Sequence, residues 1–184
     1  MKKRYFKYSK LQSQLDLPFL ETPEEHLIKI FETINIKFGL RKESKQKFID
    51  LGSGNGQVVI FTTLNYQIKS TGIEIDQELV KEARERIRKI KKEYSFYKKL
   101  VKKIRIVNTD FYQNSVNSFD FIYIYSLPTM QKYLKHVIST AKMSAVIISY
   151  KYPLEGFEEI LNFEYKLEIG NGEGKINTFF YKRL

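Results

Sequence analysis

The chain has 184 residues, contains no cysteine and carries a formal net charge of +11 at pH 7. This length suits a single domain whose core buries roughly 70% of the unfolded surface, and it is too short for two ordinary domains. The absence of cysteine excludes a disulfide framework and a thiolate nucleophile or metal ligand, which fits a cytoplasmic protein. The only histidines, His26 and His136, are far apart in the sequence, so no metal site is expected.

The basic charge bears on the possible partners. Of the 32 basic residues, 25 are lysine and seven are arginine. Arginine is the residue that makes bidentate contacts to phosphates and bases, so the charge permits a nucleic-acid partner without favouring one. No apolar run approaches the about 18 residues of a membrane helix, and we therefore expect no transmembrane segment.

The first 45 residues divide into two parts. Residues 1–20 are a basic, aromatic arm, and residues 21–45 are expected to form a helical segment before a core at 46–184. Thr22 is a good N-cap, Pro23 suits the first helical position, and glutamates follow them. We interpret His26 as a surface or partly packed helix residue without a catalytic role.

Residues 48–59 run from an apolar strand, expected at 47–51, through a glycine turn into an apolar helix, expected at 56–66. Glycines at 52, 54 and 56 remove the Cβ atoms that would block a ligand, and they permit positive φ. Backbone N–H groups at the start of the helix can face a carboxylate or phosphate. The stretch predicts a loop that binds a nucleoside cofactor.

The type of cofactor depends on the residues after the loop. A dinucleotide fingerprint requires glycine where the chain has Gln57, and a P-loop requires Gly-Lys-Ser/Thr, so a nucleotide-binding oxidoreductase is disfavoured. The next predicted strand, at 71–75, contains Glu74 near its carboxyl end, 22 residues after Gly52. A carboxylate at this place can accept two hydrogen bonds from a ribose diol.

The remaining pattern alternates strands and helices. A long helix with a basic face is expected from Gln77, supported by pairs such as Glu82 with Arg86 and Glu85 with Lys89. Strands are expected at 104–108, 119–125 and 145–150, with a helix near 129–140. The order predicts an α/β fold with right-handed crossovers. Two further strands, at 163–169 and 175–182, surround a glycine-rich turn and predict an antiparallel hairpin.

The spacing of Asp50, Gly52, Gly54 and Gly56 resembles motif I of the class I, seven-stranded S-adenosylmethionine-dependent methyltransferases. This resemblance extends from about Phe19 to Leu184. It implies a Rossmann-like, mostly parallel sheet of order 3-2-1-4-5-7-6 that ends in the antiparallel hairpin. It also implies S-adenosyl-L-methionine as the cofactor and S-adenosyl-L-homocysteine as the product.

Three lysine-directed groups within this class are similar to parts of the chain. Residues 48–59 resemble motif I of the non-SET histone lysine methyltransferases of the telomeric-silencing type. The sequence Thr-Pro-Glu at 22–24 is similar to that of the archaeal broad-specificity lysine methyltransferases. Residues 122–130 and 147–153 resemble the mitochondrial lysine methyltransferases that act on the c-type subunit of ATP synthase and on the adenine nucleotide translocase, although the chain lacks their apolar membrane-anchoring segment.

The resemblance implies a cofactor site. Asp50 and its glycines would line the methionine end, Glu74 would hold the ribose, Asp110 would meet the adenine amino group, and Phe111 would pack on the ring. The full expected set is Glu21, Thr22, Asp50, Gly52, Ser53, Gly54, Asn55, Gly56, Glu74, Ile75, Asp110, Phe111 and Tyr125.

On the acceptor side, Tyr125 and the turn Ser126-Leu127-Pro128 occupy the motif IV position beside the reactive methyl. Tyr125, Ser126, Tyr150 and Tyr152 are the candidate catalytic residues, and the tyrosines could form an aromatic channel or be ordinary packing residues. The chain lacks the Asn/Asp-Pro-Pro-Tyr/Phe motif that binds a planar amide or amine. The resemblance implies a protein lysine acceptor, with acidic substrate surfaces preferred. An RNA methyltransferase and a catalytically silent cofactor-binding protein remain as alternatives.

Overall fold

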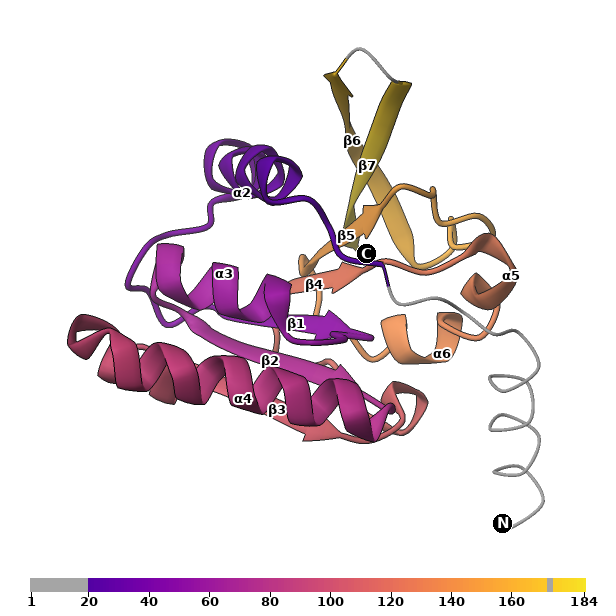
Figure 1. Ribbon diagram of the computed structural model, residues 1–184. Helices are drawn as coiled ribbons and strands as arrows, with labels where there is room; N and C mark the ends of the chain where they lie inside the picture. The colour runs from indigo at the N-terminus through magenta and orange to yellow at the C-terminus, as the bar shows by residue number, and fades with distance from the viewer. Residues whose placement is uncertain (1–19, 172–173) are drawn as a thin grey trace, which may run out of the picture.

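The computed structural model of the chain describes residues 20–171 and 174–184 and contains one seven-stranded sheet (Figure 1). The strands lie in the order β3-β2-β1-β4-β5-β7-β6. The first five are parallel, and β7 is antiparallel to both β5 and β6. This confirms the strand order and the terminal hairpin expected from the sequence. The strands are β1 (Lys47–Leu51), β2 (Lys69–Glu74), β3 (Ile104–Asn108), β4 (Phe121–Ile124), β5 (Val146–Tyr150), β6 (Leu161–Asn171) and β7 (Gly174–Arg183).

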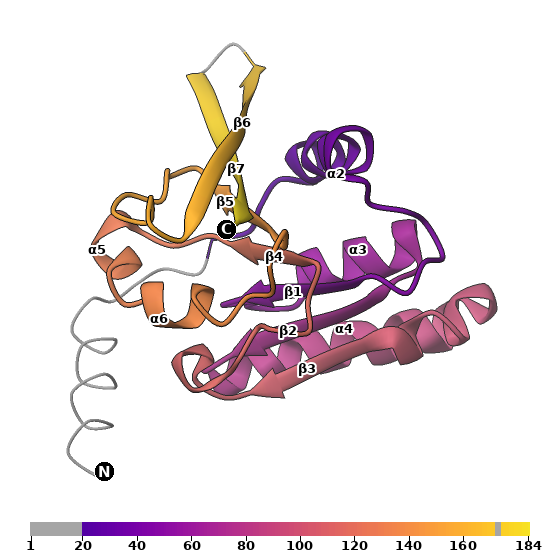
Figure 2. The same ribbon diagram turned by 180° about the vertical axis from the view of Figure 1, so that it is seen from behind.

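Helices cover both faces of the sheet. The helices α2, α3 and α4 lie over one face, and the short α5 and α6 lie on the other side (Figures 1 and 2). Their bounds are α2 (Glu24–Phe38), α3 (Gln57–Tyr66), α4 (Gln77–Glu93), α5 (Pro128–Gln131) and α6 (Lys135–Ile138), with 3-10 helices η1 (Ser95–Lys98), η2 (Val101–Lys103) and η3 (Phe111–Gln113). None of the helices in the described part of the chain is both long and apolar enough to cross a membrane. Most of the basic arm, residues 1–19, lies outside the described residues.

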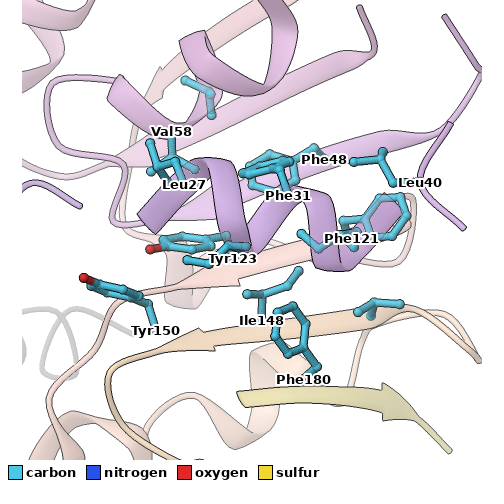
Figure 3. Close-up of a cluster of buried hydrophobic side chains, with 14 of the residues drawn as sticks. Leu27, Phe31, Leu40, Phe48, Val58, Phe121, Tyr123, Ile148, Tyr150 and Phe180 are labelled. Atoms are coloured by element: carbon cyan, nitrogen blue, oxygen red, sulfur yellow. The ribbon is translucent and has the colours of Figure 1, made fainter. Parts of the chain in front are cut away.

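The central strands are buried on both faces because successive side chains point to opposite sides. Phe121 and Tyr123 of β4 belong to the core beneath α2 and α3, whereas Ile122 and Ile124 belong to the core on the α6 side. In the first of these cores the ring of Phe31 lies 5.4 Å from that of Phe48 (Figure 3). The packing of α2 therefore brings the residues that precede it close to the carboxyl ends of β4 and β5.

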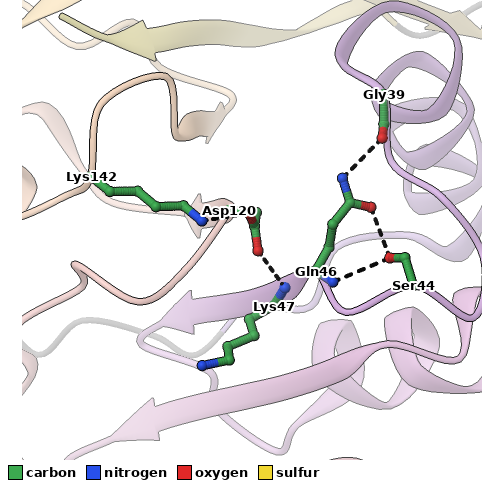
Figure 4. A network of polar contacts seen from close by, with 6 residues as sticks. All are labelled: Gly39, Ser44, Gln46, Lys47, Asp120 and Lys142. Atoms are coloured by element: carbon green, nitrogen blue, oxygen red, sulfur yellow. Dashed lines mark hydrogen bonds and ion pairs between the residues drawn. The ribbon is translucent and has the colours of Figure 1, made fainter.

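The opposite edge of the sheet is fixed by a polar anchor (Figure 4). Asp120 accepts a hydrogen bond of 2.7 Å from the backbone N–H of Lys47 and one of 2.5 Å from the Nζ of Lys142. Beside it, Gln46 donates to the carbonyl of Gly39 and accepts from the hydroxyl of Ser44. These contacts hold the starts of β1 and β4 together, far from the strand ends that form the site.

Three local expectations are wrong. Helix α2 begins at Glu24 after Pro23, without a side-chain cap, because the Thr22 hydroxyl bonds to Tyr123 instead. His26 is not a surface residue: it is only 4% exposed. The helix expected near 129–140 is two short helices, since the intervening turn forms tighter bonds such as Leu134 N–H to the carbonyl of Gln131.

The expected ion pairs along α4 are also wrong in part. Arg86 does not pair along the helix with Glu82 but reaches Glu21, and Arg88 contacts Glu85 at 3.9 Å. Tertiary contacts therefore override the helical i, i+4 spacing where the helix passes the N-terminal segment.

Replacing Asp120 with asparagine should lower the free energy of unfolding by about 1–2 kcal/mol, because an amide keeps only one of the two acceptor oxygens. Urea denaturation of Asp120→Asn measures this change, with Glu78→Gln on the exposed face of α4 as the control. A variant as stable as the parent would show that the anchor contributes nothing.

Candidate functional site

A cavity of about 610 Å³ opens at the carboxyl ends of the parallel strands. This is the edge at which open α/β sheets bind ligands. The cavity is lined by Leu20, Glu21, Thr22, Asp50, Leu51, Gly52, Ser53, Gln57, Val58, Glu74, Ile75, Asp76, Leu79, Asp110, Phe111, Tyr112, Tyr123, Ile124, Tyr125, Ser126, Leu127 and Met130. It therefore extends from a carboxylate-rich end near β2 and β3 to an aromatic and apolar end after β4.

The loop after β1 is fastened to β2. The backbone N–H groups of Gly52 and Ser53 both donate to the carbonyl of Ile73, each at 2.9 Å. Gly52 has φ +84°, a conformation that L side chains rarely adopt, and this bends the chain sharply after the strand. A second glycine, Gly72 in β2, makes room for the loop, because a Cβ at that residue would lie 2.5 Å from the Ser53 Oγ.

Glu74 is the acceptor that unites the loop and the turn after β2. One carboxylate oxygen accepts from Gly54 N–H at 2.8 Å, and the other accepts from the N–H groups of Ile75 and Asp76 at 2.8 and 2.9 Å. Hydrogen bonds to a carboxylate are stronger than those between neutral groups. Glu74 thus has a structural role that the sequence pattern did not reveal, and it also borders the cavity.

A second carboxylate, Asp50, is buried beside the first and has no charged partner of opposite sign among the described residues. Burial raises its pKa well above the usual range, and the negative charge of Glu74 adds to the increase. An unbound protein therefore carries two acidic groups that repel each other at the cavity wall. A ligand with positive charge would relieve that repulsion.

The segment before α2 closes one side of the cavity. Glu21 accepts from Asn55 Nδ2 at 2.5 Å and from Arg86 Nη1 at 3.2 Å. The Thr22 and Tyr123 hydroxyls are 2.8 Å apart and share a buried hydrogen bond. These contacts connect residues 20–22 to the glycine loop, to α4 and to β4, although these elements are distant in the sequence.

The tyrosines expected on the acceptor side lie in one cluster, but they do not all reach the cavity. Tyr125 lines it, and Tyr150 stands edge-on to Tyr125 with ring centroids 4.9 Å apart. Tyr152 lies farther out, beneath the Nζ of Lys151 at 5.6 Å from the ring centroid. Lys151 has φ +72°, so the chain turns sharply immediately after β5.

The other expected residues divide in the same way. Asp110 lines the cavity and caps η3 by accepting from the Tyr112 N–H at 2.9 Å, and Phe111 follows it. Gly54, Asn55 and Gly56 shape the loop without lining the cavity, and Gly56 has φ +78° beside Ala83 of α4.

Sequence reasoning missed several lining residues. Gln57 and Val58 follow the glycine loop on α3, and Asp76 and Leu79 begin α4. Their places directly after strand ends were a usable signal. No pattern pointed to Leu20 or Met130, which reach the cavity only because their segments pack over it.

Comparison with known proteins agrees with this geometry. Residues 50–160 match the family described as the ANTKMT methyltransferase domain. The lysine N-methyltransferase of Caenorhabditis elegans that is named for the C-type subunit of ATP synthase is 24% identical over 167 residues, which cover 91% of this chain and 80% of the relative.

Solved structures share the fold. An RNA methyltransferase from Salinibacter ruber in complex with S-adenosyl-L-homocysteine has a TM-score of 0.71 and 18% identity, covering 89% of this chain and 93% of that one. A mutant of MtNAS in complex with S-adenosylmethionine has a TM-score of 0.65 and 13% identity, covering 85% of this chain and 61% of that one. Because the family match spans more than half of the residues, the chain belongs to the ANTKMT methyltransferase-domain family and is an S-adenosylmethionine-dependent methyltransferase.

Proposed function

We propose that this enzyme methylates the ε-amine of lysine in a protein substrate. The observation that carries the proposal is the composition of the cavity beyond the carboxylates, where Tyr123, Tyr125, Leu127 and Met130 form an aromatic and apolar wall. Such a wall suits a long apolar side chain with an amine at its end. The lysine methyltransferase of Caenorhabditis elegans supports the same class of acceptor.

In this proposal the cofactor lies along the strand ends. Its ribose hydroxyls donate to Glu74, and its adenine lies between Asp110 and Phe111. The methionine part passes the loop at Gly52 and Ser53, where its ammonium group faces Asp50. The cofactor carries positive charge at both the sulfonium and the ammonium, and this charge complements the two buried carboxylates.

The bound sulfonium supplies an electrophilic methyl group. The nitrogen lone pair of the neutral lysine attacks that carbon as the carbon–sulfur bond breaks, and sulfur keeps the bonding electrons. The enzyme therefore has to align the amine and exclude water, and such positioning can supply ~7–11 kcal/mol. Tyr125 and Ser126 are the groups of the chain that border this end of the cavity.

The acceptor must first lose a proton, since a lysine in water has a pKa near ~10.4. Lys151 stands beside the tyrosine cluster, and its interaction with Tyr125 raises its pKa, so it stays cationic. A fixed positive charge disfavours the ammonium form of an incoming lysine. The exposed Lys132 and Lys151 also favour substrates with acidic surfaces, a preference that the basic net charge supports.

Methyl transfer should therefore depend on a protein. In a cell extract supplied with tritiated S-adenosylmethionine, the label should be lost after protease and kept after ribonuclease. Mass spectrometry should place it on lysine, with a higher yield for lysines near acidic residues. Label that survives protease and disappears after ribonuclease would instead support an RNA methyltransferase. No label with any substrate, despite cofactor binding, would support a silent binding protein.

Replacing Asp50 with asparagine should have opposite effects on binding and on stability. Because the folded pKa of Asp50 is raised, its contribution to stability is present at low pH and lost as pH rises through that value. Asp50→Asn should therefore raise the melting temperature at neutral pH. It should weaken S-adenosylhomocysteine binding by about 1.5–3 kcal/mol, the usual value for a hydrogen bond to a charged group.

Calorimetry and thermal unfolding measure these two effects of Asp50→Asn. The parent should also lose affinity as pH falls through the raised pKa of Asp50, and the variant should not. Asp120→Asn is the matched control, because it should lower stability and leave affinity unchanged. Unaltered affinity in Asp50→Asn would remove Asp50 from the cofactor site.

The contacts of Glu21 should slow release of the cofactor. Glu21→Ala removes the hydrogen bonds to Asn55 and Arg86, and the S-adenosylhomocysteine dissociation constant should rise about fivefold, equivalent to ~1 kcal/mol. Stopped-flow measurement should assign most of this change to faster dissociation. Glu24→Ala, an exposed carboxylate in the first turn of α2, is the control, and equal rates in both variants would contradict a gating role.

A further inference from the structure

His26 is a buried polar residue that the proposed chemistry does not use. It lies in the first turn of α2 but is only 4% exposed, and its Nδ1 is 2.6 Å from the Tyr150 hydroxyl. Its Nε2 lies 3.7 Å from a carboxylate oxygen of Glu25, whose side chain is 59% exposed. A buried ring nitrogen without a partner would be costly, so the bond to Tyr150 fixes the orientation of both rings.

Tyr150 transmits this orientation to the cavity. It does not line the cavity itself, but its ring is perpendicular to that of Tyr125, at an interplanar angle of 89° and a centroid distance of 4.9 Å. Its other face is stacked with Tyr123 at 6.4 Å. Edge-to-face aromatic pairs have a preferred geometry, so a displaced Tyr150 would leave Tyr125 without its support.

The same short segment serves the other side of the cavity. Thr22, four residues before His26, bonds to the hydroxyl of Tyr123, and Figure 3 shows the Tyr123 and Tyr150 hydroxyls on the same side of the aromatic cluster. The start of α2 is thus attached to the ends of two adjacent strands. One attachment, through Thr22, reaches a residue of the cavity directly, whereas the other acts through Tyr150.

We propose that His26 is a positioning residue for the acceptor, because it holds Tyr150 and thereby the ring of Tyr125 at the end of the cavity where the amine must align. The inference rests on the proposed function, since it assigns Tyr125 to the acceptor side. It goes beyond that function by giving α2 a specific role in methyl transfer. Loss of the hydrogen bond should slow transfer, while the cofactor, which lies along other strand ends, should bind as before.

The test uses His26→Leu, Tyr150→Phe and the double variant, with a lysine peptide that the parent methylates. Each single change should lower kcat about fivefold or more, as expected for a lost buried hydrogen bond, with the S-adenosylhomocysteine dissociation constant within about twofold of the parent. The double variant should be no slower than either single variant, because both remove the same bond. His26→Asn, which keeps a polar atom near the Nδ1 position, should recover part of the rate.

Stability is measured in parallel to separate positioning from folding. In the double variant both polar groups are gone, so the melting temperature should partly recover while kcat stays low. Thr33→Val is the control for α2, because this buried hydroxyl bonds only within the helix, to the carbonyl of Lys29 at 2.9 Å, and it should leave kcat unchanged.

Three results would overturn the inference: parental kcat in His26→Leu, additive losses in the double variant, or a loss of cofactor affinity that accounts for the whole decrease. Failure of the proposed function is distinguishable from these results. In that case the folded parent, with its cofactor bound, would methylate no lysine peptide or protein at all.

Discussion

The site depends on one carboxylate that accepts three backbone hydrogen bonds. Glu74 binds the N–H of Gly54 from the loop after β1 and the N–H groups of Ile75 and Asp76 from the turn after β2. Two segments that the chain separates by about 20 residues therefore share one anionic acceptor. The glycine at 72 allows the loop to approach β2 closely enough for this contact. Without the carboxylate, these amides would need other partners, because buried backbone groups are rarely left unpaired.

The same wall contains a cost that the enzyme tolerates for its function. Asp50 is buried and close to Glu74, and both burial and that neighbouring charge oppose its ionisation. A protein selected for stability alone would place an uncharged side chain there. Buried carboxylates that repel each other cluster at functional sites because they become favourable once a cationic ligand binds. In this protein the positive charges of S-adenosylmethionine are of the required sign, so ligand binding and the acidic wall support each other.

Much of the fold could be predicted from local patterns. The strand–glycine–helix sequence, the acidic residue near the end of β2 and the glycine-rich turn between β6 and β7 are signals within short segments. They placed β3 correctly at Ile104–Asn108 and predicted the hairpin. Predictions that depended on a single local rule were weaker. Thr22 matched the N-cap preference, yet its hydroxyl bonds to Tyr123, 101 residues away, because that buried phenol also requires a partner.

The sequence by itself determined the strand order, the cofactor class and most of the residues around the cofactor, since these follow from hydrophobic periodicity and from glycine and acidic residues at fixed spacing. Only the tertiary structure decided which side chains meet across the fold. It brought Glu21 to Arg86 and His26 to Tyr150, and it left Tyr152 outside the cavity. The physical reason is that local spacing fixes the direction of a side chain within its own element, whereas its partner depends on how whole elements pack against one another.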